Sequence, residues 1–132
     1  MNITDMHAGL VHFPIALFTG AAVLDIWGRI IGRESLRTTS RHVLNLGLLS
    51  AIPTAITGLL ASKYINPDVL AHMQKHRLCA LTTISIALVL VIWRNSVKKA
   101  PSGTASGVYV ILLIVLALLV LFTGHLGGLV AG

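Results

Sequence analysis

The chain has 132 residues, of which 55% are hydrophobic and only 11% are charged, and its mean hydropathy is +0.88. This composition excludes an ordinary soluble domain and predicts an integral membrane protein. A membrane-crossing helix needs about 20 residues, so the length admits four spans with short links. The net charge of +6 comes from basic residues spread over these links, which favours a role in membrane topology over nucleic-acid binding.

Four apolar stretches predict a single transmembrane domain over residues 1–132, folded as an all-α, up-down antiparallel four-helix bundle. Pro14 lies near the start of the first span, where a proline is tolerated, and it favours an extended or turn conformation at His12 and Phe13. Asn66 and Pro67 are typical of a helix start. The expected helices cover about 11–31, 43–62, 67–95 and 108–128.

The second span carries small residues at four-residue spacing, namely Ser50, Thr54, Gly58 and Ser62. Such rows allow helices to approach closely in lipid. We expect this face to pack against neighbouring helices or against another subunit.

Charged residues cluster where the first span ends. Asp25 and Arg29 are one helical turn apart and are expected to form an ion pair, with a proton or ligand contact as the alternative. From Arg29 to Arg41 an arginine recurs every four residues. If one helix continued through this link, the arginines would form a basic stripe that faces anionic headgroups.

The basic residues also predict the topology. Seven basic residues share one side of the membrane, whereas the other side holds only Lys63, Lys75 and Arg77, so the positive-inside rule predicts N-out and C-out. Trp27, Trp93 and Tyr109 then fall near the inner interface, as aromatic anchors do. The seven residues on the cytoplasmic side are Arg29, Arg33, Arg37, Arg41, Arg94, Lys98 and Lys99.

This topology brings five of the six histidines to the outer side. An up-down bundle would gather His7 and His12 of the first span, His72 and His76 of the third, and His125 of the fourth at one depth. His42 falls at the opposite interface.

Several ligands suit such a histidine cluster. Two neutral imidazoles on facing helices can supply the axial ligands of a b-type haem, and copper or zinc is chemically open as well. The alternative without a cofactor is a network of interfacial histidines that bond to backbone groups and water.

The strings H-A-G-L-V-H-F-P-I-A-L and T-G-H-L-G-G resemble the signatures of a bacterial family of four-helix predicted integral membrane proteins of unknown function. The family's opening motif reads H-P-x-x-V-H-F-P-I-A-L and matches His7 and residues 11–17, with Ala8 in place of its first proline. Asp25 and His76 match further family positions. Similar domains are joined to Rieske-like or c-type cytochrome modules, so the resemblance implies electron transfer in a bacterial inner membrane.

The preferred ligands are therefore His12, His76 and His125, two of which would bind the haem iron, while His7 and His72 flank the site. The sequence thus predicts a small electron-transfer subunit resembling a b-type cytochrome, in contact with the bilayer, other membrane subunits and a quinol or a cytochrome. The alternative is a cofactor-free accessory subunit of a larger membrane complex. A transporter is a third option, and a self-contained enzyme has less support than either a redox or an accessory subunit.

Overall fold

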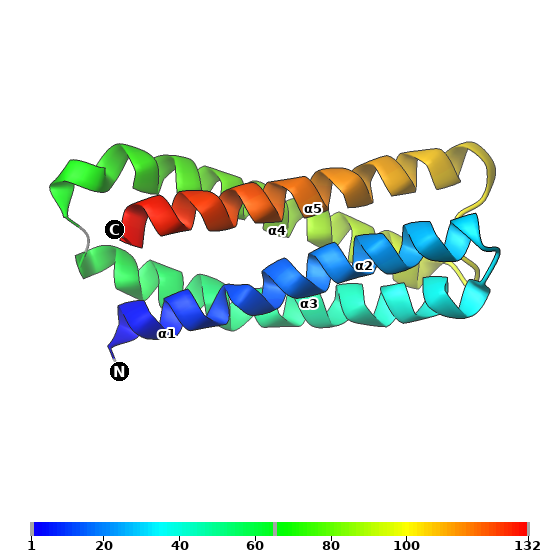
Figure 1. Ribbon diagram of the computed structural model, residues 1–132, viewed down its shortest axis with the longest axis horizontal. Coiled ribbons are helices and arrows are strands. Elements are labelled where there is room, and N and C mark those ends of the chain that lie inside the picture. Colours follow the sequence, from blue (N-terminus) through cyan, green and yellow to red (C-terminus); the bar gives the residue numbers. More distant parts are fainter. Residues whose placement is uncertain (1, 65, 132) are drawn as a thin grey trace.

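The computed structural model describes residues 2–64 and 66–131, and the regular elements in these residues are all helices. Four helical rods lie side by side, and both termini are at the same end (Figure 1). Each rod is long and apolar enough to cross a membrane, which confirms the predicted all-α membrane protein. The elements are α1 (Ile3–Leu10), α2 (His12–Ile30), α3 (Glu34–Ala61), the 3₁₀ helices η1 (Ser62–Tyr64) and η2 (Pro67–Val69), α4 (Leu70–Ser96) and α5 (Gly103–Ala131).

The first span begins eight residues earlier than expected because a capping box starts α1. The Asn2 side chain accepts a hydrogen bond from the backbone N–H of Asp5 at 2.9 Å, and the Asp5 carboxylate accepts one from the backbone N–H of Asn2 at 3.2 Å. This reciprocal pair satisfies two amide groups that a helix start leaves without partners. As a result, His7 lies on a helix.

The expected extended conformation at His12 and Phe13 is wrong, since both residues are helical. Pro14 has no N–H, so the carbonyl of Leu10 loses its partner within the helix. The Thr54 hydroxyl of α3 lies 3.3 Å from that carbonyl oxygen and 2.8 Å from the carbonyl oxygen of Ser50, so its one proton is shared between the two acceptors. A neighbouring helix therefore accommodates the proline, and only Val11 interrupts the helical run between α1 and α2.

Two other helices also start early: α3 begins nine residues before the predicted position and α5 begins five residues before it. Gly32, with a φ of 68°, turns the chain between α2 and α3, a conformation that glycine adopts without steric cost. The predicted basic stripe is therefore divided. Arg29 lies on α2, whereas Arg37 and Arg41 lie on α3.

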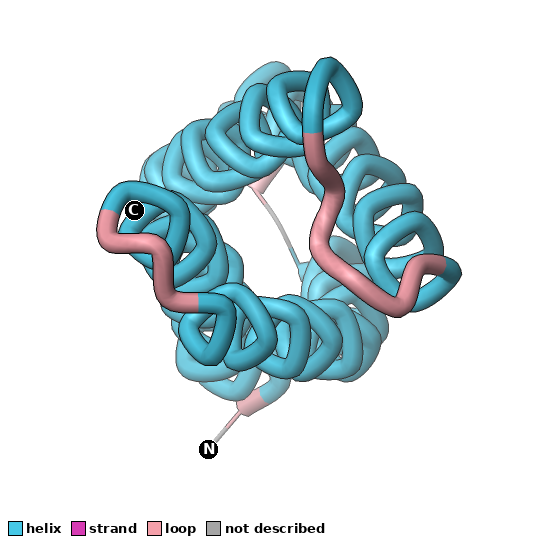
Figure 2. The backbone as a smooth tube through the Cα atoms, turned by 90° about the vertical axis from the view of Figure 1, so that its right-hand side faces the viewer, coloured by secondary structure: helices cyan, strands magenta, loops and turns pink. Residues whose placement is uncertain are grey.

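The molecule consists of two equivalent helical hairpins, α1–α2–α3 and α4–α5. Nine of the twelve buried positions in α2 and α3 recur as buried positions in the second hairpin after a shift of 69 residues. Around the bundle, α2 packs on α3, α3 on α4, α4 on α5 and α5 on α2, an arrangement visible end-on in Figure 2. A pseudo-two-fold axis along the bundle relates the hairpins. Positions 14, 18, 21, 25, 40, 44, 47, 51 and 57 correspond to 83, 87, 90, 94, 109, 113, 116, 120 and 126.

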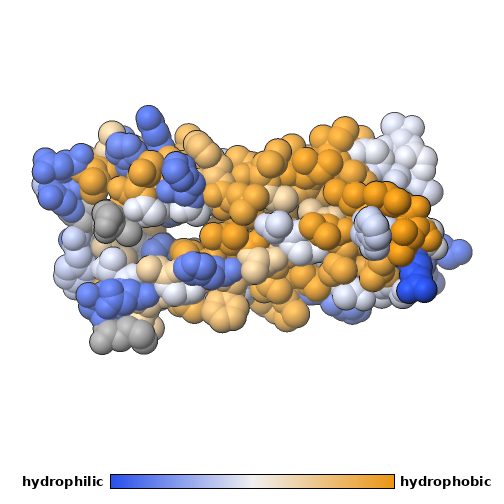
Figure 3. All heavy atoms as spheres, in the orientation of Figure 1, coloured by the Kyte–Doolittle hydropathy of each residue, from blue (hydrophilic) through white to orange (hydrophobic). Residues whose placement is uncertain are grey.

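The small residues of the second span pack within the chain, as expected. A Cβ atom on Gly47 would lie 2.7 Å from the Phe18 ring, and Phe18 itself is completely buried. On the face shown in Figure 3, the middle of the molecule is mostly covered by apolar side chains, which suits contact with lipid. Tyr109 is an exception to the predicted aromatic anchors because it is completely buried in the core.

Candidate functional site

His7 packs between α1 and α3 near the end of the bundle that holds both termini. Its Nδ1 lies 3.0 Å from the carbonyl oxygen of Thr54 and 3.3 Å from the hydroxyl of Thr57. The carbonyl can only accept, and the Thr57 hydroxyl already donates to the Pro53 carbonyl, so the hydrogen bonds assign a proton to Nδ1. In the neutral ring, Nε2 then keeps its lone pair.

His76 repeats this arrangement in the second hairpin. Its Nδ1 lies 3.0 Å from the carbonyl oxygen of Thr123 on α5, and the ring is half-buried. His7 and Thr54 are 47 residues apart, and so are His76 and Thr123. The same reasoning assigns a proton to Nδ1 of His76 and leaves its Nε2 able to accept or to bind a metal.

The two histidines, which we call the histidine pair, meet across the bundle. Their ring centroids are 6.4 Å apart and their planes are nearly perpendicular, at 83°. His7 is anchored to α3 and His76 to α5, so each hairpin contributes one imidazole. The surface is open between the two hairpins near this end of the molecule (Figure 3).

Two glycines make room for these rings. A Cβ atom on Gly58 would lie 2.8 Å from Cε1 of His7, and one on Gly127 would lie 3.2 Å from Cε1 of His76. The first distance is too short for a real contact, and the second is tight. Gly58 and Gly127 are also 69 residues apart, so the hairpins share a histidine, a threonine carbonyl and a glycine.

The remaining histidines lie outside this pair. His12 is exposed, with Nδ1 at 3.3 Å from the carbonyl oxygen of Gly9, and His72 and His125 are exposed too. The sequence predicts His12 as a ligand and His7 beside the site, whereas in the structure His7 packs against α3 and His12 is exposed. The reason is the early start of α1, which makes His7 part of a packed helix. His42 is exposed on α3.

No group of three or more His, Cys, Asp or Glu side chains able to hold a metal is found among residues 2–64 and 66–131. The histidine pair thus offers two nitrogen ligands. A haem iron needs only two axial ligands from the protein, whereas structural zinc takes four. The donor set suits a haem better than a bare zinc ion.

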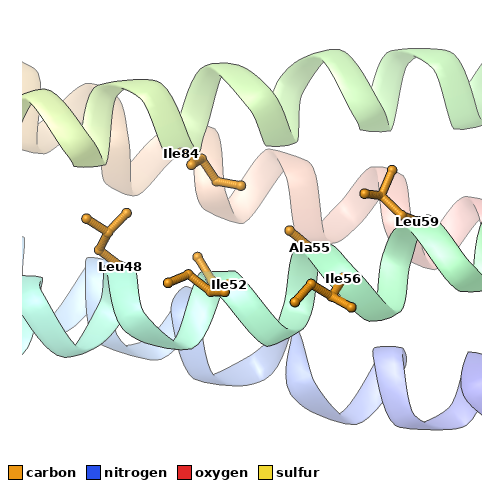
Figure 4. A pocket seen from close by; sticks show the side chains of 7 residues that line it. Leu48, Ile52, Ala55, Ile56, Leu59 and Ile84 are labelled. Atoms are coloured by element: carbon orange, nitrogen blue, oxygen red, sulfur yellow. The ribbon is translucent and has the colours of Figure 1, made fainter.

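An aliphatic cavity of about 240 Å³ lies between α3 and α4, on the same helix as the partners of His7. Ala55 and Leu59 line it and directly follow Thr54 and Gly58 in the sequence. Figure 4 shows the lining side chains, which come from α3 except for Ile84 of α4. The cavity between these two helices is therefore apolar.

Two signals in the sequence point to the pairing of His7 with His76, which the order of the predicted spans alone does not give. Asn2 and Asp5 have the spacing of a capping box, which places the helix start before His7. The pattern of a histidine, a threonine 47 residues later and a glycine four residues after that occurs once in each half of the chain. Together these signals distinguish His7 and His76 from the other three histidines at this end of the bundle.

Comparison with known proteins finds a family model, described as "Predicted membrane protein (DUF2231)", that matches residues 4–132. No curated protein matches the chain, and no solved structure does.

Proposed function

The chain belongs to the DUF2231 family of predicted membrane proteins, and from its geometry we propose that it is a small electron-transfer subunit in which His7 and His76 hold a b-type haem. The observation that carries the proposal is the histidine pair: two imidazoles from equivalent hairpins, 6.4 Å apart, with each Nδ1 bonded to a backbone carbonyl. The positive-inside rule predicts that the histidine pair lies on the outer side of the membrane.

His7 and His76 would hold the haem iron through their Nε2 atoms, because each Nδ1 is taken up by a hydrogen bond to a backbone carbonyl. The two rings come from different hairpins and lie 6.4 Å apart. A hydrogen bond from Nδ1–H to a carbonyl is the usual partner of a ligating histidine, because it fixes the tautomer and the ring orientation. Both histidines have this partner before any metal is considered.

The surroundings also fit a flat apolar group. The hairpins are open to each other near this end (Figure 3), and the cavity on the α3–α4 side is lined only by aliphatic residues. A haem held here would supply a one-electron carrier. The protein would orient the two imidazoles and exclude water from the macrocycle, while the exposed His12 and His125 would lie at the rim of the site.

In this function the protein passes single electrons between a quinol or a cytochrome and a larger complex in a bacterial inner membrane. The second candidate is a cofactor-free accessory subunit. It is favoured by one observation: both Nδ1 atoms already have partners and the rings already make an edge-to-face contact, so the pair forms a stable polar contact by itself.

A reduced-minus-oxidised absorption spectrum of the purified protein, with an iron determination, separates the two functions. We expect b-type bands and one iron per chain. If protein expressed with sufficient haem shows neither b-type bands nor iron, the electron-transfer proposal is wrong and the accessory function is favoured. The matched control is His42→Ala, which removes an exposed histidine of α3 far from the pair and should keep the spectrum.

A further inference from the structure

At the end of the bundle opposite to the histidine pair, charged side chains are buried. Asp25 is completely buried and forms the predicted ion pair with Nε of Arg29. Nη1 of Arg29 donates to the hydroxyl of Ser106 on α5, and the guanidinium carbon lies 5.8 Å from the ring centre of Tyr109. The ion pair is therefore enclosed between α2 and α5.

Arg94 of α4 adds a second cation, with only 2% of its surface exposed. It occupies the position in the second hairpin that Asp25 occupies in the first, 69 residues earlier. Trp93, the residue before Arg94, packs edge to face on the Tyr109 ring, with the ring centroids 5.7 Å apart. We call the side chains of Asp25, Arg29, Arg37, Arg94 and Tyr109 the inner charge cluster.

Buried atoms without partners concentrate in this cluster. Among the described residues, all such side-chain atoms except the Thr19 hydroxyl belong to it. Orphaned buried polar groups are rare in folded proteins because each one costs free energy. The atoms are Asp25 Oδ1, Arg29 Nη2, Arg37 Nε, Arg94 Nε and Nη1, and the Tyr109 hydroxyl.

The cluster also carries excess positive charge. Arg29 is neutralised by Asp25, and Arg37 pairs at 2.9 Å with Glu34, whose side chain is 56% exposed. Arg94 has no carboxylate within ion-pair distance in the described part of the chain. A buried charge needs a counter-charge, so the site favours an anion.

The orphaned atoms also specify the kind of anion. The Arg94 and Arg29 nitrogens require acceptors, whereas Oδ1 of ionised Asp25 requires a donor. A phosphate group with a second pKa of about 6 still carries a proton in part of its population near neutral pH. Such a group accepts from the arginines and donates its own proton to Asp25. A sulfate or a phosphodiester has no proton to donate.

We propose that the inner charge cluster binds a phosphate group that carries a titratable proton, held by Arg94, Tyr109 and Arg29 and recognised through Asp25. Two sources have this chemistry, inorganic phosphate and the headgroup of phosphatidic acid. The α4–α5 link contacts this cluster, since Nη2 of Arg37 donates to the carbonyl of Pro101 at 3.1 Å. The site is on the cytoplasmic side in the predicted topology.

The test measures the thermal unfolding midpoint of the purified full chain in detergent. Inorganic phosphate is compared with sulfate at matched ionic strength, and micelles with phosphatidic acid are compared with micelles containing phosphatidylglycerol. We expect phosphate or phosphatidic acid to raise the midpoint and sulfate and phosphatidylglycerol to leave it unchanged. The arm that responds identifies the source.

Two variants test the assignment. Arg94→Gln should remove the stabilisation, and Lys99→Gln, an exposed cation at the same end, should retain it. Asp25→Asn replaces the acceptor by an amide donor, so sulfate should now stabilise the protein as well as phosphate does. The stabilisation of Asp25→Asn by sulfate can be seen only in folded protein. It therefore tests the proposal even if Arg94→Gln fails to fold. Equal stabilisation of the native chain by phosphate and sulfate, or no response to any of the four anions, would overturn the proposal.

Discussion

The two ends of the bundle differ in how similar their equivalent positions are in the two hairpins. At the histidine pair the equivalent positions are identical, with His7 matching His76 and Gly58 matching Gly127. At the inner charge cluster they differ, because Asp25 matches Arg94 and Ser40 matches Tyr109. Identical residues on either side of the axis suit a ligand that is held equally from both sides. Unequal residues suit a ligand with distinct donor and acceptor sides.

The ends also differ in how their polar groups are satisfied. Each imidazole bonds to a carbonyl of the neighbouring helix, whereas the inner cluster leaves several buried atoms without partners. Backbone carbonyls therefore hold the histidine pair in place. The inner charge cluster, by contrast, carries one buried cation that no carboxylate of the described residues neutralises, which is why we propose an anion there.

The largest expected effect comes from removing either member of the histidine pair. His7→Ala and His76→Ala should each abolish the b-type spectrum, and to the same extent, because each removes one of two equivalent axial ligands. Added imidazole should restore part of the absorbance in both variants. Optical titration with haem measures the loss. A spectrum that survives His7→Ala but not His12→Ala would show that the outer histidines act in the order predicted from the sequence.

Removing the buried carboxylate should give the next largest effect. Asp25→Ala leaves Arg29 without its counter-charge, and breaking a buried pair in this way costs about 3–5 kcal/mol of unfolding free energy. Ser40→Ala at the same end removes one neutral hydrogen bond of 2.7 Å to the carbonyl of Ala21 and should cost only about 1 kcal/mol. Denaturant unfolding in micelles compares the two. Equal losses would contradict a charged role for Asp25.

A smaller effect tests the space around the imidazoles. Gly58→Ala places a methyl group 2.8 Å from His7, and overpacking of this kind costs about 1–3 kcal/mol. We expect lower haem occupancy as well as a lower unfolding midpoint. Gly127→Ala, at 3.2 Å from His76, should do less. Gly128→Ala is the control, because a methyl group there meets nothing within 4 Å, and it should gain about 1 kcal/mol of helix propensity.

The smallest expected effect concerns the proline. Thr54→Val removes the hydroxyl that the carbonyls of Ser50 and Leu10 share but keeps the Thr54 backbone carbonyl that holds His7. Interhelical hydrogen bonds in membranes contribute about 0.6 kcal/mol, so the unfolding free energy should fall by roughly that amount. The haem spectrum should not change. A lost spectrum would mean that the hydroxyl, and not the carbonyl, orients His7.

Much of the fold could be predicted because hydropathy and helix length depend on local composition. The four spans, the Asp25–Arg29 ion pair and the close-packed small residues of α3 follow from such patterns. The early starts of α3 and α5 could not be predicted from hydropathy, because polar residues extend a helix beyond the apolar stretch. The conformation around Pro14 depended on a hydroxyl supplied by another helix.

The candidate site was predicted only in part. The sequence by itself determined that five histidines would share one end, since the order of spans and links decides which residues lie at the same depth. Which of them meet was decided by the tertiary structure: His7 and His76 face each other because threonine carbonyls on α3 and α5 hold them and glycines leave room. The same is true of Arg94, whose charge predicted only that it lies on the cytoplasmic side. Packing of the two hairpins buries it beside Tyr109, because burial depends on neighbours that are far away in the sequence.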